Sequence, residues 1–525
     1  MSSFSFALLF FILGFISLAY EVLWFRFLSF TTGSDARTFG IFLSFFLAGI
    51  AAGSLFSEKY SRALKALWPS TNMPPLSYFF FLSSLVAFLI LPALGWLSSL
   101  GIWQLTFIAI FFSTSLFGAA FPLLSHSSIS LNNKTGWAFS LFYLSNILGC
   151  TLGSLLTNML LTDIWSGQQI TFFLLFIGFL QSWVLIIFQP RLNKRFLVFF
   201  VSVSAIFYGL IYYYLAPLGF QDLYAKLLYK KNYRESSPLS AILENRHGII
   251  AVNQAGAVFG NGAYDGMFSI DLAHDPNMIK RVYFIGLLHP HPSDVLIVGL
   301  GSGSWTRVII NLPGVEKVTI VEINPGYQKI IRHKPDSADI LDNKKVTLIT
   351  DDIRRWLRRN PSQKFDLVVQ NAPIHNHASA TNLLSQEYLG FIKTHLKERG
   401  VFYYNTTFSQ EALKTGILQF PYGLRFINCI AVSNSPITVD RNRWESLLKS
   451  FTIHGIPVLD LSIPEHQQKY TELAGIFDSL QSNPQPCGLE TRESILERTN
   501  RLAIITDDNM FTEFSGKSPP EIHCE

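Results

Sequence analysis

The sequence has little charge and little cysteine for its length. Only 15% of its 525 residues are Asp, Glu, Lys or Arg, and the formal net charge is +5. This small positive excess gives no indication of a nucleic-acid partner, and we expect none. The four cysteines form no Cys-x-x-Cys pair, so we expect no zinc site and no disulfide framework. Such cysteine usage is consistent with a reducing compartment.

The N-terminus lacks the basic segment and the small-residue cleavage site of a secretory signal peptide. We therefore expect the first apolar segment to be retained as a helix. Apolar residues are abundant, and Phe alone occurs 47 times. This balance is typical of a membrane protein that also carries a soluble part.

Seven apolar runs are long enough to cross a bilayer, which takes about 20 residues each. The runs lie near Phe4–Phe30, Thr38–Phe56, Leu76–Leu97, Ile102–Pro122, Trp137–Leu161, Ile170–Phe188 and Phe196–Leu215. They predict an α-helical multi-pass membrane bundle over residues 1–218. Glycines four apart, at Gly49 and Gly53 and again at Gly149 and Gly153, favour close helix packing over a pore.

Three polar residues interrupt these apolar runs: Glu21, Arg26 and Asn146. Ionisable groups at membrane depth are costly and are functional candidates by default. The alternative is that Glu21 and Arg26 lie near an interface and extend their polar ends toward water. The sequence leaves both interpretations open.

The orientation of the spans is ambiguous. Basic residues follow the second span (Lys59, Arg62, Lys65), the fourth (Lys134) and the sixth (Arg191, Lys194, Arg195), and also the seventh (Lys226, Lys230, Lys231, Arg234). Positive loops face the cytoplasm, so a simple count of seven spans would leave the C-terminal half outside, while the last group argues the opposite. We expect a cytoplasmic C-terminal half, because nucleoside cofactors are cytosolic.

The pattern changes after residue 239. Ala241–Val252 and Gly256–Ile270 alternate and carry turn signals such as Asn261-Gly262, so a small β-hairpin subdomain is predicted over residues 239–285. From residue 286 to 525, short apolar strands alternate with helices, which predicts an α/β Rossmann-like domain with a doubly wound parallel sheet. The strands expected are Val295–Val298, Val318–Val321, Val346–Ile349, Leu367–Val369 and Val401–Tyr404, and the helices are Thr306–Asn311, Gly326–His333, Ile353–Arg359 and Gln386–Lys397.

Residues at three successive strand ends predict a nucleoside site. The turn containing Gly299, Gly301, Ser302 and Gly303 follows the first strand, where glycines allow the backbone to approach a ligand. Glu322 ends the second strand, where a carboxylate accepts hydrogen bonds from ribose hydroxyls.

Asp351 and Asp352 end the third strand, where a carboxylate can meet an adenine amino group. Asp also caps helices well, and a predicted helix begins at Ile353, so one of the two carboxylates could cap while the other binds. A solvated charge at a strand end remains the alternative for Glu322.

These motifs resemble the spermidine synthase family. The glycine turn, Glu322 and the Asp351-Asp352 position carry the resemblance, and Leu288–Gly303 looks like the bacterial membrane-fused branch of that family. Further segments that resemble this branch are Leu18–Arg26, Gly118–Pro122, Tyr143–Gly149 and Thr506–Asn509 with Glu513. The resemblance implies a small β-domain before a methyltransferase-like fold, and a multi-pass protein of the cell inner membrane. It also implies aminopropyl transfer from decarboxylated S-adenosylmethionine to putrescine.

The sequence departs from this family in the glycine turn and on the acceptor side. Ser302 stands where the soluble relatives carry an aspartate, and Asn371 stands at the position of their catalytic base. Asn371 cannot accept a proton near neutral pH. The loop that begins at Asn371, called the acceptor loop below, also lacks the second aspartate of the family. His375 and His377 are candidate replacements, since a neutral imidazole can act as a base. A metal site and a polar surface loop are the alternatives for this His-x-His pair.

The sequence therefore predicts a polyamine-related transferase that binds S-adenosylmethionine or its decarboxylated form and uses no metal. Its partners would be the lipid bilayer and a small amine or a membrane-delivered substrate. A methyltransferase acting on a membrane-delivered substrate is one alternative. A non-catalytic nucleoside sensor of a transporter-like bundle is another. The sequence leaves open whether the protein forms a homo-oligomer.

Overall fold

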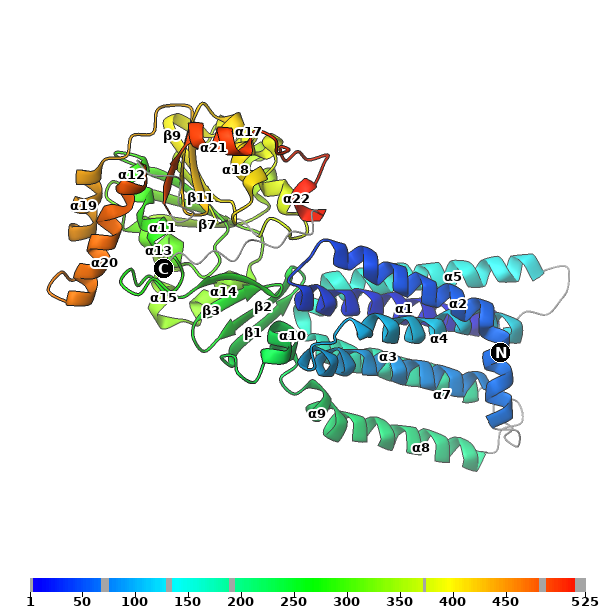
Figure 1. Ribbon diagram of the computed structural model, residues 1–525. Coiled ribbons are helices and arrows are strands. Elements are labelled where there is room, and N and C mark those ends of the chain that lie inside the picture. The colour runs from blue at the N-terminus through cyan, green and yellow to red at the C-terminus, as the bar shows by residue number, and fades with distance from the viewer. Residues whose placement is uncertain are drawn as a thin grey trace. The chain divides into compact units, whose positions relative to one another are not determined.

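The computed structural model describes residues 3–67, 75–128, 135–187, 194–371, 374–480 and 488–514. Its chain separates into two compact units, shown in Figure 1. The first comprises Met1–Gly33, Arg37–Leu239 and Glu244–Ile249, and the second comprises Ser34–Ala36, Ser240–Leu243 and Ile250–Glu525. The basic loop residues Lys134 and Arg191 lie outside the described residues.

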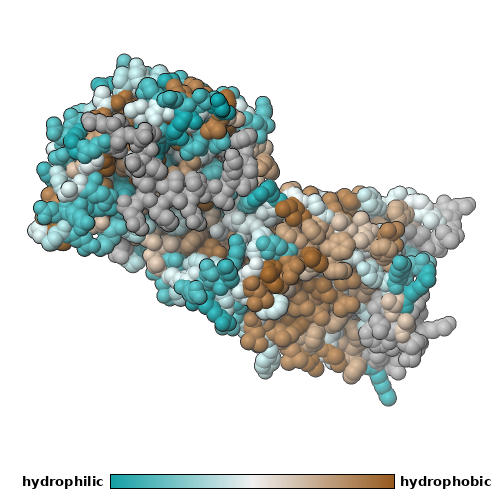
Figure 2. Space-filling model, in the orientation of Figure 1, coloured by the Kyte–Doolittle hydropathy of each residue, from teal (hydrophilic) through white to brown (hydrophobic). Residues whose placement is uncertain are grey.

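The first unit is a bundle of long apolar helices. Seven helices in the described residues are long and apolar enough to cross a membrane, and they lie where the sequence predicts them. Figure 2 shows hydrophobic side chains gathered over these helices. Two of the seven spans consist of several helical elements, so the elements outnumber the spans. The elements are α1 (Ser3–Thr32), α2 (Arg37–Leu67), α3 (Pro75–Ser99), α4 (Leu105–Ser128), α5 (Thr135–Leu156), α6 (Thr162–Ile164), α7 (Gly167–Ile187), α8 (Lys194–Leu210), α9 (Ala216–Phe220) and α10 (Leu223–Tyr229), with π-helical turns η1 (Thr157–Leu161) and η2 (Ile211–Leu215).

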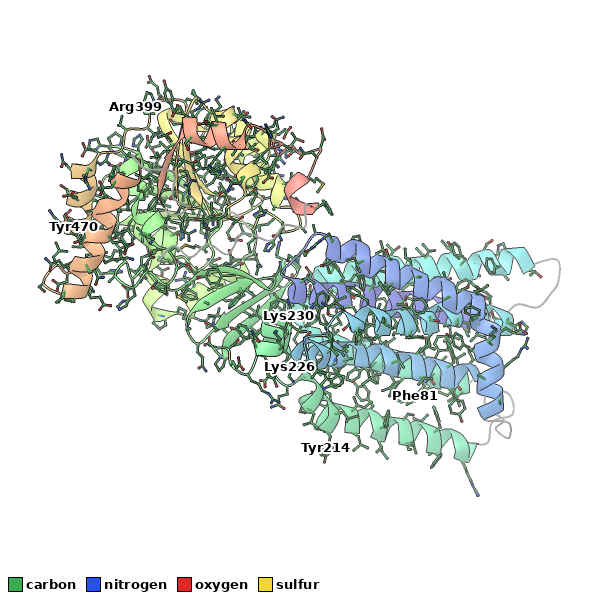
Figure 3. The ribbon with its side chains drawn as sticks, in the orientation of Figure 1. Phe81, Tyr214, Lys226, Lys230, Arg399 and Tyr470 are labelled. Carbon is green, nitrogen blue, oxygen red and sulfur yellow. The ribbon has the colours of Figure 1, made fainter. Side chains whose placement is uncertain are left out.

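Glycines and aromatic rings hold these helices together. A Cβ added to Gly149 of α5 would lie 1.9 Å from the carbonyl oxygen of Phe11 in α1, and one added to Gly53 of α2 would lie 1.8 Å from that of Ser115 in α4. In each pair, the two helix backbones can come this close only because glycine has no side chain. This confirms the predicted close packing of the helices. Phe81 of α3, labelled in Figure 3, stacks on Phe179 of α7 with ring centroids 4.3 Å apart.

Two of the three polar residues in the apolar runs, Arg26 and Asn146, have partners inside the first unit. The Arg26 guanidinium donates to the carbonyl oxygen of Gly248 at 2.7 Å and lies 3.8 Å from the carboxylate of Glu244. That carboxylate also accepts the N–H of Gly167 at the start of α7, at 3.0 Å. Asn146 donates across the helix interface to the carbonyl oxygen of Phe10, at 3.1 Å. Arg26 and Asn146 therefore have structural partners.

The strands form two main sheets, and the larger one belongs wholly to the second unit. A small sheet has the order β1-β2-β3-β4, and an eight-stranded sheet has the order β14-β10-β11-β9-β8-β5-β6-β7. The strands are β1 (Leu239–Asn245), β2 (Gly248–Asn253), β3 (Ala257–Gly260), β4 (Ala263–Met267), β5 (Asp294–Val298), β6 (Lys317–Glu322), β7 (Val346–Thr350), β8 (Phe365–Gln370), β9 (Leu396–Asn405), β10 (Tyr422–Phe426), β11 (Cys429–Ser433) and β14 (Leu489–Thr491), with a separate pair β12 (Thr452–Ile453) and β13 (Ile456–Pro457).

The large sheet is mixed: the predicted doubly wound parallel sheet is present, and three further strands that were not predicted extend it. Strands β9, β8, β5, β6 and β7 are parallel, as expected. Strands β10, β11 and β14 add an antiparallel edge. The connection from β10 to β11 is only Ile427 and Asn428, and so short a connection can join only antiparallel neighbours.

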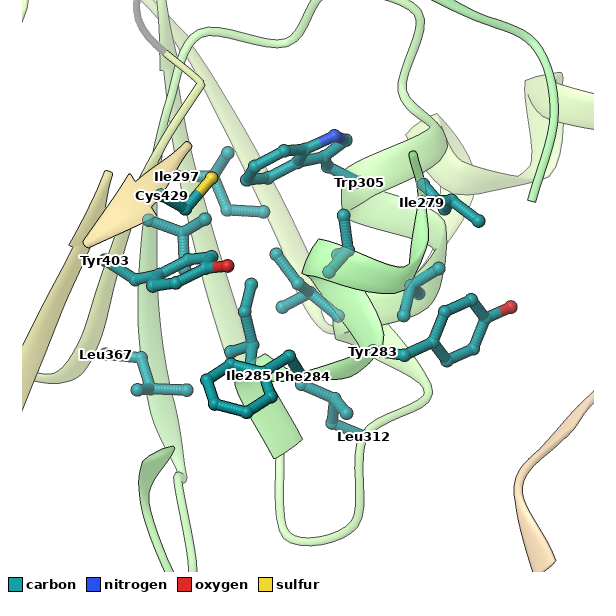
Figure 4. Close-up of a cluster of buried hydrophobic side chains, with 14 of the residues drawn as sticks. Ile279, Tyr283, Phe284, Ile285, Ile297, Trp305, Leu312, Leu367, Tyr403 and Cys429 are labelled. Atoms are coloured by element: carbon teal, nitrogen blue, oxygen red, sulfur yellow. The ribbon is translucent and has the colours of Figure 1, made fainter. Parts of the chain in front are cut away.

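Helices and two apolar cores cover the large sheet. One core gathers around Phe284, Trp305 and Tyr403, shown in Figure 4, and the other around Trp356, Tyr388 and Phe402. The helices are α11 (Lys280–Tyr283), α12 (Ile285–Leu288), α13 (Ser304–Ile310), α14 (Gly326–Arg332), α15 (Pro335–Asp342), α16 (Ile353–Arg359), α17 (Gln386–Thr394), α18 (Gln410–Gln419), α19 (Arg441–Ser450), α20 (Pro464–Ala474), α21 (Arg492–Thr499) and α22 (Phe511–Phe514).

One predicted boundary is corrected by the strand that follows it. The helix expected over Gln386–Lys397 ends at Thr394, and Leu396 already begins β9. The backbone of Phe365 pairs with that of Leu396, so the strand extends further toward its N-terminus than its apolar residues suggest.

Candidate functional site

The glycine turn joins β5 to α13 through left-handed backbone. Gly299, Gly301 and Gly303 have φ angles of 85°, 52° and 78°, which residues with a side chain rarely adopt. A Cβ on Gly301 would lie 3.0 Å from the carbonyl oxygen of Asp265. Ser302 is buried, and its Oγ lies 2.9 Å from that of Ser304. The turn thus has the tight geometry that the sequence predicts.

Glu322 at the end of β6 lies against this turn. One carboxylate oxygen accepts the N–H of Leu300 at 2.7 Å, and the other accepts the N–H of Asn324 at 2.7 Å. Only 6% of the residue is exposed. Burial raises the pKa of Glu322 to about 7, although the hydrogen bonds from Asn324 and Leu300 oppose this shift. Two backbone donors therefore fix the carboxylate, and each oxygen keeps a lone pair for a ligand.

Sequence reasoning missed a second carboxylate beside Glu322. Asp265 of β4 is half-buried, its backbone meets the glycine turn, and its side chain accepts a hydrogen bond from the hydroxyl of Tyr327 in α14. Burial raises the pKa of Asp265 to about 6, and its charge in turn contributes to the raised pKa of Glu322. An acidic residue inside a short strand beside Gly266 was the available signal.

Asp351 and Asp352 follow β7 and are both engaged with α16. The Asp352 carboxylate caps this helix by accepting the N–H of Arg355 at 2.8 Å. The Asp351 carboxylate accepts the N–H of Asp352 at 2.7 Å and forms an ion pair with Arg355. The structure thus shows that the capping residue is Asp352, while adenine recognition by either carboxylate stays a prediction.

The residues expected to meet the acceptor substrate lie at the ends of β8 and β9, and this part of the site is called the acceptor side. The strand order reverses between β5 and β8, and open α/β sheets bind ligands at such a point. Asn371 follows β8, and its carbonyl oxygen accepts a hydrogen bond from the amide of Asn405 at 2.9 Å. Because Asn405 donates to Asn371, the position of the expected base holds a neutral amide pair.

The two histidines of the acceptor loop lie in a mostly buried setting. His375 is 6% exposed, and its Nδ1 lies 2.8 Å from the Thr407 hydroxyl. Burial, together with His375, lowers the pKa of His377 to about 4, and Asp35 opposes this shift. His377 is therefore neutral at pH 7 and holds a proton only weakly. Their roles in catalysis stay a prediction.

Asp35 is a contributor from a distant part of the sequence. Residues 34–36 connect α1 to α2 but cluster with the second unit. Asp35 and His377 form an isolated antiparallel bridge, and the N–H of Ala378 donates to the carbonyl oxygen of Ser34 at 2.9 Å. No periodicity in the sequence indicates this contact.

The segment Thr506–Asn509 and Glu513 hold the acceptor loop from another side. The Glu513 carboxylate accepts the N–H groups of Ser379 and Thr381 at 2.9 and 2.8 Å. Asp507 pairs with Arg354 at 2.6 Å and accepts the Ser385 hydroxyl at 2.6 Å. These contacts give Asp507 and Glu513 of the C-terminal motif a structural role. Within the described ranges, no three His, Cys, Asp or Glu residues are grouped to hold a metal ion.

Comparisons with known proteins agree with this architecture. Residues 278–418 match the family model of the spermine/spermidine synthase domain. Polyamine aminopropyltransferase 2 of Streptomyces coelicolor is 30% identical over 129 residues, which are 23% of this chain and 23% of that protein. The polyamine aminopropyltransferase of Oceanobacillus iheyensis is 24% identical over 410 residues, which are 74% of this chain and 75% of that protein.

Among solved structures, spermidine synthase from Thermotoga maritima aligns with 18% identity and a TM-score of 0.33, covering 45% of this chain and 88% of that chain. The fold assignment rests on the strand order rather than on this value. The matched residues 278–418 contain the glycine turn, Glu322, the Asp351-Asp352 pair and the acceptor loop. The C-terminal region of this chain therefore carries a spermine/spermidine synthase domain, preceded by a multi-helix segment.

Proposed function

We propose that the protein is a membrane-anchored, aminopropyltransferase-like enzyme that binds an S-adenosyl nucleoside. The observation that carries this proposal is the fixed carboxylate of Glu322 beside the glycine turn. A carboxylate held in this way can accept both ribose hydroxyls, while Gly299 to Gly303 leave room for the rest of the nucleoside. Decarboxylated S-adenosylmethionine and S-adenosylmethionine share this nucleoside part.

The reaction would be a substitution at the carbon beside the sulfonium. The amine of the acceptor forms the new carbon–nitrogen bond, the carbon–sulfur bond breaks, and a thioether nucleoside leaves. Holding both reactants together where the strand order reverses, between β5 and β8, would supply much of the rate enhancement. The amine must also lose a proton, which Asn371 cannot accept; His375 and His377 are the imidazoles on this side.

Replacing Glu322 tests nucleoside binding directly. Glu322→Ala should weaken binding of an S-adenosyl nucleoside by about 1.5–3 kcal/mol, the scale of a hydrogen bond to a charged group. Isothermal calorimetry on the full-length protein in detergent measures this loss. Glu316→Ala is the matched control, since Glu316 is exposed and precedes the opposite end of β6. Equal affinity in Glu322→Ala and wild type would remove Glu322 from the site.

A methyltransferase acting on a membrane-delivered substrate is the second candidate. It is favoured by Asn371, which stands where the relatives carry the base that deprotonates the amine, and by the absence of the second aspartate that would bind a diamine. A nucleoside sensor without catalysis would also tolerate these residues. Product analysis with either nucleoside, with and without putrescine, separates the three. A transferred aminopropyl group supports the first, a methylated lipid the second, and binding without any product the third.

The seven apolar helices support anchoring in the cell inner membrane, with the lipid bilayer as a partner. Cofactor supply favours a cytoplasmic C-terminal unit, although a count of basic loops for seven spans favours the other side. Reporters fused after Glu525 test this orientation. Fluorescence from a cytoplasm-dependent reporter should appear. Alkaline phosphatase activity without fluorescence would place the unit outside and would contradict the use of a cytosolic nucleoside.

A further inference from the structure

A buried arginine lies beside the candidate site, and its hydrogen-bond partners are three uncharged oxygens and the thiol of Cys429. Arg281 of α11 is 5% exposed. Its guanidinium donates to the carbonyl oxygen of Met278 at 2.9 Å, to the side-chain oxygen of Asn428 at 2.8 Å and to the carbonyl oxygen of Asn277 at 3.1 Å. In the described part of the chain, no carboxylate lies within ion-pair distance of it.

A second buried arginine shows what is unusual about this environment. Arg425 is also 5% exposed, but it forms an ion pair with Glu490 at 2.5 Å. Removing a guanidinium from water is costly unless an anion and hydrogen bonds compensate for the lost hydration. Arg281 has the hydrogen bonds without the anion. A bound ligand can supply the missing negative charge.

Hydrogen bonds connect Arg281 to the acceptor side of the site. Arg281 binds the side chain of Asn428, whose carbonyl oxygen accepts the N–H of Thr406 at 2.7 Å. Thr406 follows Asn405, which donates to Asn371 at the end of β8. The positive charge is therefore linked to the strand ends that would receive an acceptor.

Arg281 also contacts the part of the site where the nucleoside is expected to bind. Its guanidinium carbon lies 5.5 Å from the ring centroid of Trp305, two residues after the last glycine of the turn. Figure 4 shows Trp305 together with Tyr403 and Cys429, which belong to β9 and β11. The arginine thus contacts structure that belongs to both sides of the candidate site.

Asn277 provides an independent indication of a ligand. It is 5% exposed, and its side-chain oxygen accepts the Tyr264 hydroxyl at 2.7 Å. Its side-chain nitrogen is buried and finds no hydrogen-bond partner among the described residues. Buried polar groups are nearly always satisfied. A donor without a partner, on the residue whose carbonyl oxygen accepts a hydrogen bond from Arg281, therefore suggests a missing acceptor group.

We propose that Arg281 and Asn277 bind a carboxylate group of a substrate. The guanidinium would supply charge and an N–H group, and Asn277 a further donor. This inference rests on the proposed nucleoside site. Two sources share this chemistry: the amino-acid end of S-adenosylmethionine, which the decarboxylated form lacks, and a carboxylate on the acceptor. In either case a positive charge at this position disfavours a diamine.

Calorimetry with three nucleosides tests the first source on the full-length protein in detergent. S-adenosylmethionine carries the carboxylate, decarboxylated S-adenosylmethionine lacks it, and methylthioadenosine lacks the whole chain. We expect the wild type to bind S-adenosylmethionine about tenfold more tightly than the decarboxylated form, which corresponds to about 1.4 kcal/mol. Arg281→Gln should abolish this preference and leave methylthioadenosine affinity unchanged.

Two further variants separate ligand binding from packing. Asn277→Asp keeps the acceptor for Tyr264 and places a carboxylate beside Arg281, so it should also abolish the preference while preserving the fold. Arg443→Gln is the matched control. Arg443 donates to the carbonyl oxygens of Gly286 and His289 at 2.8 and 2.6 Å, and its loss should leave the preference intact.

The second source is tested by titrating acetate into protein saturated with methylthioadenosine, followed by saturation-transfer NMR. Acetate binding that disappears in Arg281→Gln, without a nucleoside preference, supports a carboxylate on the acceptor. Absence of both the preference and Arg281-dependent acetate binding, in protein that binds methylthioadenosine, would overturn the inference. If the wild type bound no methylthioadenosine, the proposed function would fail, while Arg281-dependent binding of acetate to the nucleoside-free protein would still support the carboxylate site.

Discussion

At the ends of β5 and β6, the Glu322 carboxylate that would meet a nucleoside is held by backbone N–H groups, whereas the side chains of Asn371 and His375, which follow β8, are held by other side chains. Glu322 binds Leu300 and Asn324 through their backbone. Asn371 is held by the side chain of Asn405, and the ring of His375 meets the Thr407 hydroxyl.

The difference has a physical consequence for how each side can change. Backbone donors stay in place as long as the strands and the turn fold, so the geometry around Glu322 depends on the fold rather than on neighbouring side chains. Side-chain partners change with single substitutions. The acceptor side can therefore be altered without loss of the nucleoside side, and three predictions test this contrast.

The largest effect is expected at the acceptor side. The wild type should make little or no spermidine from decarboxylated S-adenosylmethionine and putrescine, because Asn371 cannot act as a base. General bases contribute typically about 10²–10⁴-fold. Asn371→Asp should therefore raise this activity by about 100-fold, measured by chromatography of the polyamine products.

Asn405→Asp is the control for this experiment, since it adds a carboxylate at the neighbouring strand end without placing it after β8. Efficient turnover of micromolar putrescine by the wild type would show that the acceptor side is intact despite Asn371. If Arg281 repels the diamine, the gain from Asn371→Asp should be larger when it is combined with Arg281→Gln.

An intermediate effect is expected from pH at the nucleoside side. The pKa of Glu322 is raised to about 7, so the residue is largely protonated at pH 6 and largely ionised at pH 8. Ribose hydroxyls donate to the ionised form, so ionisation should favour binding. The affinity for methylthioadenosine should rise about tenfold from pH 6 to pH 8, following the ionised fraction of a single group.

Calorimetry at several pH values measures this rise, and Glu322→Gln should remove it. Asp265 titrates nearby, with a pKa raised to about 6, so Asp265→Asn should shift the midpoint to lower pH without abolishing the rise. An affinity that falls as the pH increases would mean that the protonated carboxyl group binds the ribose.

The sequence predicted what depends on local pattern and on strand ends. The apolar runs, the glycine turn and Glu322 follow from periodicity, because the carboxyl ends of parallel strands meet at one edge. Asp265 and Asp35 could not be predicted in this way. One depends on how the small sheet meets the glycine turn, and the other on a contact with His377, which is more than 300 residues away in the chain.

The antiparallel edge of the large sheet was missed for a similar reason. The residues of β10 and β11 were not separated into strands, because the pattern after Asn405 gives no clear helix or strand period. Arg425, which pairs with Glu490 of β14, is a charge inside a buried strand. Periodicity treats such a residue as a loop signal, although a partner brought in from the distant β14 allows its burial.

The smallest effect is expected at Asp352, where capping and ligand binding can be separated. Its carboxylate accepts the N–H of Arg355, so Asp352→Ala removes a helix cap and should lower stability by about 1 kcal/mol. Asp352→Asn keeps a capping oxygen and should retain most of that stability in thermal unfolding. If Asp352 only caps, Asp352→Asn should bind methylthioadenosine as the wild type does. If its charge also receives the adenine amino group, Asp352→Asn should stay stable yet bind more weakly, which would extend the backbone-held nucleoside side from Glu322 to the end of β7.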